Sequence, residues 1–537
     1  MTPPRSLSFQ RPWLWWFMLI ILAIVAAARL RLLAFPLERD EGEYAYAGQL
    51  LLQGIPPYEL AYNMKFPGTY LAYAAIMAVF GQTPAGIHLG LLVMTTATAL
   101  MLFWLGKKML DETAGAVAAG SYAILAASPT MLGLAGHATH FCAFFLTAGL
   151  CFFWLARQKE TWPRIAAFAL CFGTAVLMKQ HAALIAAWAG LAFAYGKFLD
   201  RKNPVARNLL SVTFCAVMML LPLALCCLWL WHAGVFATFK FWTFDYAREY
   251  ASAVPLSYAP NTFAQGVHWS MGKVFLFPLL TLIGLVVVLR DPRWQGSRAW
   301  IFGFCCTSAL AVCPDFYFRK HYFLILLPAM VLLVGAAISG LRKMWSEQCP
   351  VIAYTVIAII TMVTLSGVWF VKPMAEVIRG TSAVNHGLYG PDPLPEAEIV
   401  AQYIRENSAP DARIAVLGSE PEIYFLARRH SASGFVYTYA LMEPQPFALQ
   451  MQHQMIGDLE TNRPAFIVFV KNGMSTGIQP DSDLTLYRWW DSYQTNYTRV
   501  GVTDIVSATN TIVALGADYA PHYPKTYGSS LEIYQRR

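Results

Sequence analysis

The sequence predicts a polytopic α-helical membrane protein with about eleven transmembrane helices, followed by a C-terminal α/β domain. Three observations lead to this class. Only 13% of the 537 residues are charged, whereas a soluble protein carries about 25%. The deficit is confined to residues 1–371, which hold long apolar runs, while residues 372–537 have an ordinary globular composition. We therefore expect a membrane domain over 1–371 and a soluble domain over 372–537.

The net positive charge belongs to the membrane part. Residues 1–371 contain 26 Lys and Arg against 14 Asp and Glu, and residues 372–537 contain 13 against 17. Basic residues beside apolar runs are typical of cytoplasmic anchors, so the total of +8 does not indicate a nucleic-acid-binding protein. All ten cysteines precede residue 350, so the C-terminal domain has no disulfide framework.

A spanning helix needs about 20 mostly apolar residues. The first candidate run has no small-residue cleavage site after it, so we interpret it as a retained helix and not as a signal peptide. A further stretch, 67–81, is shorter and is bounded by Pro67 and Gly81. The candidate spans are 13–33, 84–106, 113–131, 137–156, 162–178, 182–199, 208–232, 271–290, 298–313, 321–341 and 350–371.

Charge in the connecting segments predicts that 67–81 lies in the membrane surface without crossing it. With this segment in the plane, the N-terminus and every second loop fall on one side, which the positive-inside rule places in the cytoplasm. The long loops 34–83 and 233–270 and the C-terminal domain then lie on the outer face. The basic residues gathered on the cytoplasmic side are Arg5, Arg11, Lys107, Lys108, Arg157, Lys159, Arg164, Lys197, Arg201, Lys202, Arg207, Arg290, Arg293, Arg298, Arg342 and Lys343.

Residues 372–537 alternate predicted helices and strands. PEAEIVAQYIREN at 395–407 fits an amphipathic helix, and 420–429 is also predicted to be helical. RIAVLG at 413–418 is a short apolar strand, and AFIVFV at 465–470 is a continuous apolar run of the kind buried on both faces of a sheet. This alternation predicts a small α/β layer domain.

Acidic residues are few on the predicted outer face, and four of them lie within 38–43, directly after the first span. A helix is predicted over 44–52, so Asp40 and Glu41 stand at the start of a helix that lies on the bilayer. A helix N-terminus stabilises the charged form of a carboxylate, which suits a general base. A solvated acidic loop is the alternative interpretation. No carboxylate lies deep inside a span, which argues against a proton-coupled transporter.

Basic residues at three separate sites on the same face can hold a phosphate. Lys65 precedes the in-plane segment, and Lys179 ends a span. Arg319, Lys320 and His321 stand together at the mouth of the tenth span. Snorkelling toward the interface explains any one of these sites taken alone. Three sites at headgroup depth favour an anionic lipid ligand.

The order of these motifs resembles that of the GT-C membrane glycosyltransferases, in particular bacterial relatives of protein O-mannosyltransferases and lipid A aminoarabinose transferases. VLGSEPEIYFLARR at 416–429 is similar to the periplasmic domain that many of these proteins carry. The motifs of the membrane part that carry the likeness are RDEGEY at 39–44, GIPPY at 54–58, KFPGTYL at 65–71, GTAVLMKQHAAL at 173–184 and RKHYFLILLP at 319–328.

The resemblance implies an inverting transfer of a sugar from a polyprenyl-phosphate donor to an acceptor hydroxyl on an envelope glycan, lipid or protein. It places the reaction at the outer face of a bacterial inner membrane, with the N-terminus cytoplasmic and the C-terminal domain periplasmic. By this likeness Asp40 is the general base, Glu41 orients the acceptor or supports the site, and Lys65 lies near the donor phosphate. Lys179 and the cluster 319–321 are further candidates for that phosphate.

The second outer loop departs from the family pattern, in which an acidic residue sometimes binds a metal. Residues 132–140 contain no carboxylate, but His137 and His140 stand three apart at a predicted helix start and can bind a divalent metal or the phosphate. Two interfacial histidines are the alternative, so the need for a metal stays open. The alternative functions are a lipid-linked sugar flippase or transporter and an oligosaccharide ligase that uses a lipid pyrophosphate.

Overall fold

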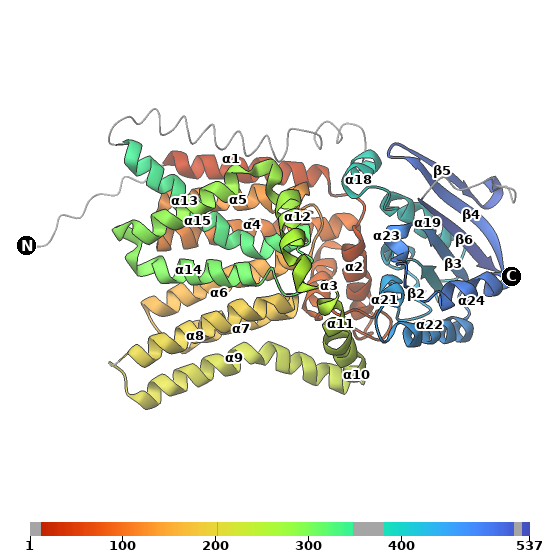
Figure 1. Ribbon diagram of the computed structural model, residues 1–537, viewed down its shortest axis with the longest axis horizontal. Coiled ribbons are helices and arrows are strands. Elements are labelled where there is room, and N and C mark those ends of the chain that lie inside the picture. The colour runs from red at the N-terminus through yellow and green to blue at the C-terminus, as the bar shows by residue number, and fades with distance from the viewer. Residues whose placement is uncertain (1–11, 201, 347–380, 520–528) are drawn as a thin grey trace, which may run out of the picture.

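The computed structural model describes residues 12–200, 202–346, 381–519 and 529–537. A bundle of helices formed by the chain up to Ser346 lies beside a C-terminal domain that starts at Thr381 (Figure 1). The long helices run side by side, and the sheet of the C-terminal domain lies beyond one end of them (Figure 1). The expected domain boundary near residue 371 and the predicted span 350–371 lie outside the described residues.

Every predicted span within the described residues contains one of the bundle helices. Six helices there are long and apolar enough to cross a membrane, which confirms a multi-pass helical architecture. A bent pair brings this number to seven, and the remaining bundle helices are shorter, so the count of about eleven stays a prediction. The bundle helices are α1 (Pro12–Arg31), α4 (Pro84–Met109), α5 (Glu112–Leu125), α6 (Ala138–Gln158), α7 (Trp162–Met178), α8 (Ala183–Leu199), α9 (Val205–His232), α13 (Leu276–Arg290), α14 (Gln295–Leu310) and α15 (Phe323–Ser346).

The predicted span 271–290 is broken near its start. The chain bends by 96° between Leu256–Val274 and Leu276–Arg290, so only the second part continues into the bundle. The segment before the bend, which was expected to be a loop, is a series of short helices at one end of the bundle (Figure 1). They are α10 (Phe236–Lys240), the π-helix η3 (Phe241–Tyr246), α11 (Ala247–Ser252), η4 (Leu256–Tyr258), α12 (Ala259–Met271) and η5 (Gly272–Val274).

The loop 34–83, called the first outer loop after its expected position, contains the helices α2 (Arg39–Leu52) and α3 (Gly68–Phe80). A helix of 13 residues such as α3 is about 20 Å long, shorter than the roughly 30 Å hydrocarbon core. This length agrees with the prediction that 67–81 does not cross the membrane. In Figure 1, α2 lies across the ends of the long helices, between the bundle and the C-terminal domain.

A capping box starts α2 at the acidic motif. The Glu38 side chain accepts a hydrogen bond from the Asp40 amide over 2.8 Å, and Glu41 Oε2 accepts one from the Glu38 amide over 3.3 Å. The prediction that Asp40 and Glu41 stand at a helix N-terminus is therefore confirmed. The cap also fixes the directions in which the side chains of Asp40 and Glu41 point from the first turn of α2.

The C-terminal domain contains a six-stranded mixed sheet in the order β2-β1-β3-β6-β4-β5. The pairs of β1 with β2 and β3 are parallel, and the pairs among β3, β6, β4 and β5 are antiparallel. The α/β layer prediction is confirmed, and the four predicted elements are found within a few residues. The strands are β1 (Arg413–Leu417), β2 (His430–Ser431), β3 (Phe466–Lys471), β4 (Tyr497–Ser507), β5 (Asn510–Leu515) and β6 (Ser529–Arg536), and the helices are α18 (Thr381–Tyr389), α19 (Leu394–Glu406), α20 (Glu422–Ala427), α21 (Tyr439–Met442), α22 (Ala448–Asn462), α23 (Gly473–Thr476) and α24 (Thr485–Tyr493).

The C-terminal domain packs tightly on the first outer loop. A Cβ atom at Gly42 of α2 would lie 2.6 Å from the Glu422 backbone nitrogen of α20, so only glycine allows the two helices to approach this closely. The Tyr62 amide donates to the Gly434 carbonyl over 2.7 Å, which adds a main-chain hydrogen bond between the two parts. The start of α2 is therefore held between the bundle and the C-terminal domain.

Candidate active site

A cavity of about 820 Å³ lies where the bundle meets the C-terminal domain. Its size is that of a pocket for a small molecule. Asp40 and the cluster 319–321, which the sequence analysis treated as separate candidates, line this one cavity. The lining side chains considered below are Glu38, Arg39, Asp40, Lys65, Lys179, Tyr250, Arg319, Lys320, His321, Tyr389, Asp392, Tyr439, Glu443 and Met474.

Asp40 and Lys65 form an ion pair at the cavity wall. The Lys65 Nζ atom lies 3.0 Å from Asp40 Oδ1 and 2.8 Å from Glu43 Oε2. Glu43 is only 1% exposed, and the hydroxyls of Tyr70 and Tyr437 donate to it over 2.5 and 3.2 Å. One lysine charge is therefore shared between two carboxylates.

The protonation states at this wall follow from burial and from that pairing. Burial alone would raise the pKa of the Asp40 carboxyl, but the charge of Lys65 and the nearby His137 outweigh it and hold this pKa well below its usual range. Burial, and secondly the Asp40 charge, raises the pKa of Glu38 to about 7. Asp40 is therefore ionised at neutral pH, while Glu38 titrates near neutrality.

Glu41 does not line the cavity. Its Oε1 atom accepts a hydrogen bond of 2.5 Å from the Gly136 amide, and its Oε2 atom lies 3.4 Å from Nε2 of His88. The carboxylate is 1% exposed and ties the start of α2 to the second outer loop and to α4. Of the two roles that the resemblance implied for Glu41, the geometry favours support of the site.

Lys179 and Arg319 line the cavity and have no carboxylate within 4 Å among the described residues, as is also true of Arg248 and Lys320. The Lys179 Nζ atom stands 3.7 Å from the centroid of the Tyr322 ring, and Arg319 Nη2 donates to the Tyr250 hydroxyl over 2.9 Å. Burial lowers the pKa of Lys179 to about 8. A bound anion would supply the countercharge that the protein does not provide.

The two predicted histidines lie close together, with ring centroids 6.5 Å apart and planes 12° from parallel, but they contact different partners. His140 Nε2 lies 3.0 Å from the Ala126 carbonyl oxygen, facing the protein interior. His137 instead stacks on His321, with ring centroids 4.3 Å apart and planes 8° from parallel. His137 lies beside the cavity wall, with its Nδ1 atom 3.6 Å from Asp40 Oδ2.

Asp40, His137 and His321 form a group with the chemistry of a metal site. One ligand atom from each lies within 4.8 Å of the others. Both ring nitrogens of His137 are buried without a hydrogen-bond partner, as expected of a side chain that awaits a ligand. Two imidazoles and a carboxylate suit Zn²⁺ and related ions, so the residues present fit a divalent cation, with His321 in the place expected for His140.

The C-terminal domain supplies one wall of the cavity, which the sequence analysis did not predict. Its contributions come from the helix end at Tyr389, from Tyr439 and Glu443 around α21, and from Met474 of α23. Glu443 accepts a hydrogen bond of 2.7 Å from the Tyr246 hydroxyl of η3. These residues lie far apart in the sequence of the C-terminal domain, so only the fold brings them together. Glu43 was also not predicted as a site residue, although it lies within the 39–44 motif that carries the family resemblance.

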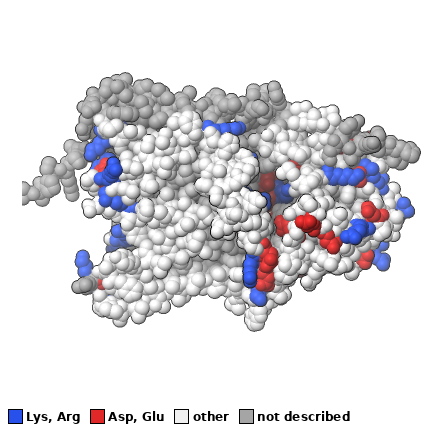
Figure 2. Space-filling model, in the orientation of Figure 1, with Lys and Arg blue, Asp and Glu red and all other residues white. Residues whose placement is uncertain are grey.

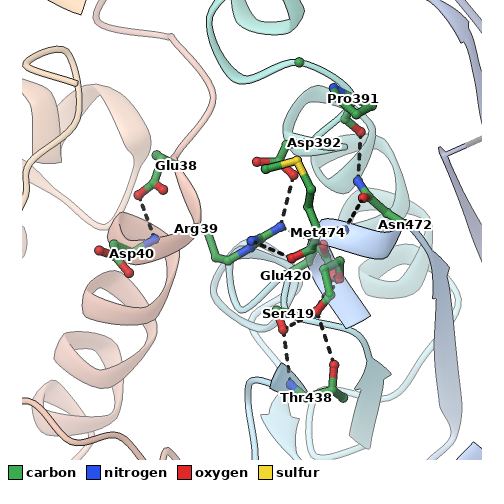
Figure 3. Close-up of polar contacts among 12 residues, drawn as sticks. Glu38, Arg39, Asp40, Pro391, Asp392, Ser419, Glu420, Thr438, Asn472 and Met474 are labelled. Atoms are coloured by element: carbon green, nitrogen blue, oxygen red, sulfur yellow. Dashed lines mark hydrogen bonds and ion pairs between the residues drawn. The ribbon is translucent and has the colours of Figure 1, made fainter. Parts of the chain in front are cut away.

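Arg39 connects that wall to the start of α2. Figure 3 shows its side chain extending from the start of α2 toward Asp392, Glu420 and Met474 of the C-terminal domain. The Nη2 atom lies 3.1 Å from Asp392 Oδ1 and 3.6 Å from Glu420 Oε1, and Nη1 donates to the Met474 carbonyl over 3.3 Å. The residue next to Asp40 is therefore bound by the neighbouring domain.

Comparison with known proteins identifies the fold. No protein-family model matches the chain. Among solved structures, the chain is similar to ArnT from Cupriavidus metallidurans bound to undecaprenyl phosphate, with a TM-score of 0.58, 14% identity and 98% of each chain covered. It is also similar to the oligosaccharyltransferase of Archaeoglobus fulgidus in complex with Zn and sulfate, with a TM-score of 0.51, 13% identity, and 92% of this chain and 73% of that chain covered. Both are GT-C membrane glycosyltransferases, so the predicted GT-C fold is confirmed.

Proposed function

We propose that this GT-C-fold chain is an inverting glycosyltransferase that moves a sugar from a polyprenyl-phosphate donor to an acceptor hydroxyl. The observation that carries the proposal is a single cavity lined by an ionised carboxylate, Asp40, and by two cations without acidic partners, Lys179 and Arg319. The carboxylate can accept the proton of the acceptor, and the cations can bind the leaving phosphate. The undecaprenyl phosphate bound to the similar ArnT supports this class of donor.

The transfer is a single displacement. The acceptor oxygen bonds to the anomeric carbon of the sugar, the bond from that carbon to the phosphate oxygen breaks, and the electron pair leaves with the polyprenyl phosphate. Because Asp40 has a low pKa, it takes the proton late, when the acceptor oxygen has become acidic by bonding to carbon.

The remaining groups supply charge. Lys179 and Arg319 stabilise the negative charge that develops on the leaving phosphate. Lys65 already binds Asp40 Oδ1, which leaves Oδ2 for the proton. A divalent cation held by Asp40, His137 and His321 would add positive charge beside the reacting atoms.

The distribution of charge supports a reaction on the outer face of the membrane. Figure 2 shows Lys and Arg gathered at the end of the bundle far from the C-terminal domain, and a long uncharged surface between the two ends. Basic residues mark the cytoplasmic side of a membrane protein. The cavity lies at the other end, so we place it and the C-terminal domain in the periplasm of a bacterium and the N-terminus in the cytoplasm.

The test is transfer by the purified protein in vesicles that contain labelled polyprenyl-phosphate sugars. The wild type should release polyprenyl phosphate and label an acceptor. Asp40→Asn keeps the shape of the side chain but removes the base, so turnover should fall by about 10²- to 10⁴-fold. The control is Asp245→Asn, because Asp245 is an exposed acid that does not line the cavity.

The outcomes separate the candidate functions. Full activity of Asp40→Asn would refute the assignment of the base. Movement of the labelled lipid across the vesicle membrane without sugar transfer would indicate a flippase. A preference for pyrophosphate-linked over monophosphate-linked donors would indicate the ligase.

A further inference from the structure

A chain of polar contacts leads from the C-terminal domain to the proposed base. The Tyr437 hydroxyl donates to Glu43 Oε2, the same oxygen that lies 2.8 Å from Lys65 Nζ, and Lys65 in turn lies 3.0 Å from Asp40. Tyr437 is 4% exposed and Glu43 1% exposed. In this buried position Glu43 depends on protein donors, because water cannot readily replace a lost hydroxyl.

The same hydroxyl also lies beside the main chain that carries the base. Tyr437 Oη lies 3.1 Å from the carbonyl oxygen of Arg39, the residue directly before Asp40, so its one hydroxyl proton is shared between this oxygen and Glu43 Oε2. The Arg39 side chain is bound by Asp392 and Glu420 of the same domain, as Figure 3 shows. Both the backbone and the side chain next to Asp40 are therefore held from outside the bundle.

The Tyr437 hydroxyl influences how the Lys65 charge is shared between Glu43 and Asp40. Glu43 and Asp40 compete for one ammonium group, and a hydrogen bond to the Glu43 anion satisfies part of its charge. Without the Tyr437 hydroxyl, Glu43 would draw Lys65 closer and away from Asp40. Asp40 would then lose both its fixed position and part of the charge that keeps it ionised.

We infer that Tyr437 is a positioning residue for the Asp40–Lys65 pair, and that the C-terminal domain is thereby a working part of the catalytic site. The inference rests on the proposed function, in which Asp40 is the base. Tyr437 acts through Glu43 and Lys65, and it need not touch the sugar or the acceptor. The domain does more than cover the cavity, since it sets the geometry of the group that takes the proton.

The matched pair Tyr437→Phe and Tyr46→Phe tests this inference. Both changes remove one buried hydroxyl from the same interface, because Tyr46 Oη accepts a hydrogen bond of 2.7 Å from the Ser431 amide of the C-terminal domain. Tyr46 makes no hydrogen bond to Glu43, Lys65 or Asp40 in the described residues. We expect Tyr437→Phe to lower kcat by about tenfold or more with donor KM within about twofold, because the lost bond involves a charged group. Tyr46→Phe should leave kcat within about twofold.

The split between kcat and donor KM provides a readout that a merely structural contact would not move, because a loss of folded protein lowers the apparent kcat of any variant equally, including the matched Tyr46→Phe. Glu43→Gln is a second variant for the case that Tyr437→Phe does not fold. It removes the carboxylate through which Tyr437 acts on Lys65, so it should also lower kcat, with donor KM within about twofold.

The outcomes separate the inference from the proposed function. Equal kcat values for Tyr437→Phe and Tyr46→Phe would overturn the inference, while the loss of transfer in Asp40→Asn would still support the glycosyltransferase. A wild-type kcat in Glu43→Gln would overturn it as well. A wild-type protein that transfers no sugar from any polyprenyl-phosphate donor would refute the proposed function, and the inference with it.

Discussion

The cavity contains two groups of charges that are built in opposite ways. At the start of α2, Lys65 is bound by both Asp40 and Glu43, so two carboxylates share one cation. Lys179 and Arg319, by contrast, contact tyrosines, namely the rings of Tyr322 and Tyr317 and the hydroxyl of Tyr250. The first group contains both signs of charge, whereas the second lacks an anion.

This difference assigns different roles to the lysines. A buried charge without a countercharge destabilises the folded state, so its presence indicates a ligand that repays the cost on binding. Lys65, which the resemblance placed near the donor phosphate, is already paired and holds the proposed base. The partly buried Lys179 is then the cation that this reasoning assigns to the phosphate, and the exposed Arg319 is proposed to act beside it.

The largest expected effect is a contrast in stability between Lys65→Met and Lys179→Met. Lys65→Met leaves Asp40 and Glu43 buried without their cation, so the free energy of unfolding should fall by about 3 kcal/mol. Lys179→Met removes a buried charge that has no partner, so stability at pH 7 should be unchanged or higher, although donor binding is lost. Thermal unfolding in detergent measures both. Equal destabilisation by the two changes would show that the two groups do not differ as described.

The sequence predicted the parts of the site that depend on local order. Charge parity and the short apolar run predicted that 67–81 lies in the membrane surface, and the helix expected directly after the acidic residues placed Asp40 at a helix start, where the structure has it. Motif order indicated the GT-C fold. These features depend on neighbours within a few residues or on composition, which a single sequence records.

Long-range pairing could not be predicted in the same way. Glu41 and Asp40 are adjacent in sequence, yet they leave α2 in different directions, and only the packing of α2 against α4 and the second outer loop shows which one reaches the cavity. His137 stacks more closely on His321, 184 positions away in sequence, than on the nearby His140, with ring centroids 4.3 and 6.5 Å apart. Tyr437 reaches Glu43 only because the C-terminal domain folds back onto the first loop.

A smaller effect is expected from the loss of Arg319. Arg319→Ala removes one of the cavity cations that have no carboxylate partner among the described residues, and a hydrogen bond to a charged group contributes about 1.5–3 kcal/mol. The donor KM should therefore rise by about 10- to 100-fold with the fold intact. Lys240→Ala is the control, because Lys240 is exposed and does not line the cavity. A normal donor KM in Arg319→Ala would place the phosphate elsewhere.

The smallest effect is a pH dependence that belongs to Lys179. Its pKa is lowered to about 8 because the ammonium group is buried, so the cation is present below pH 8 and is lost as the pH rises through that value. Donor KM should therefore increase by up to about tenfold between pH 8 and pH 9 in the wild type. Lys179→Arg stays charged over this range, so its donor KM should remain nearly constant. Steady-state kinetics from pH 6 to 9 distinguish the two. A parallel increase in both proteins would mean that a different group titrates, and that Lys179 is not the unpaired cation on which donor binding depends.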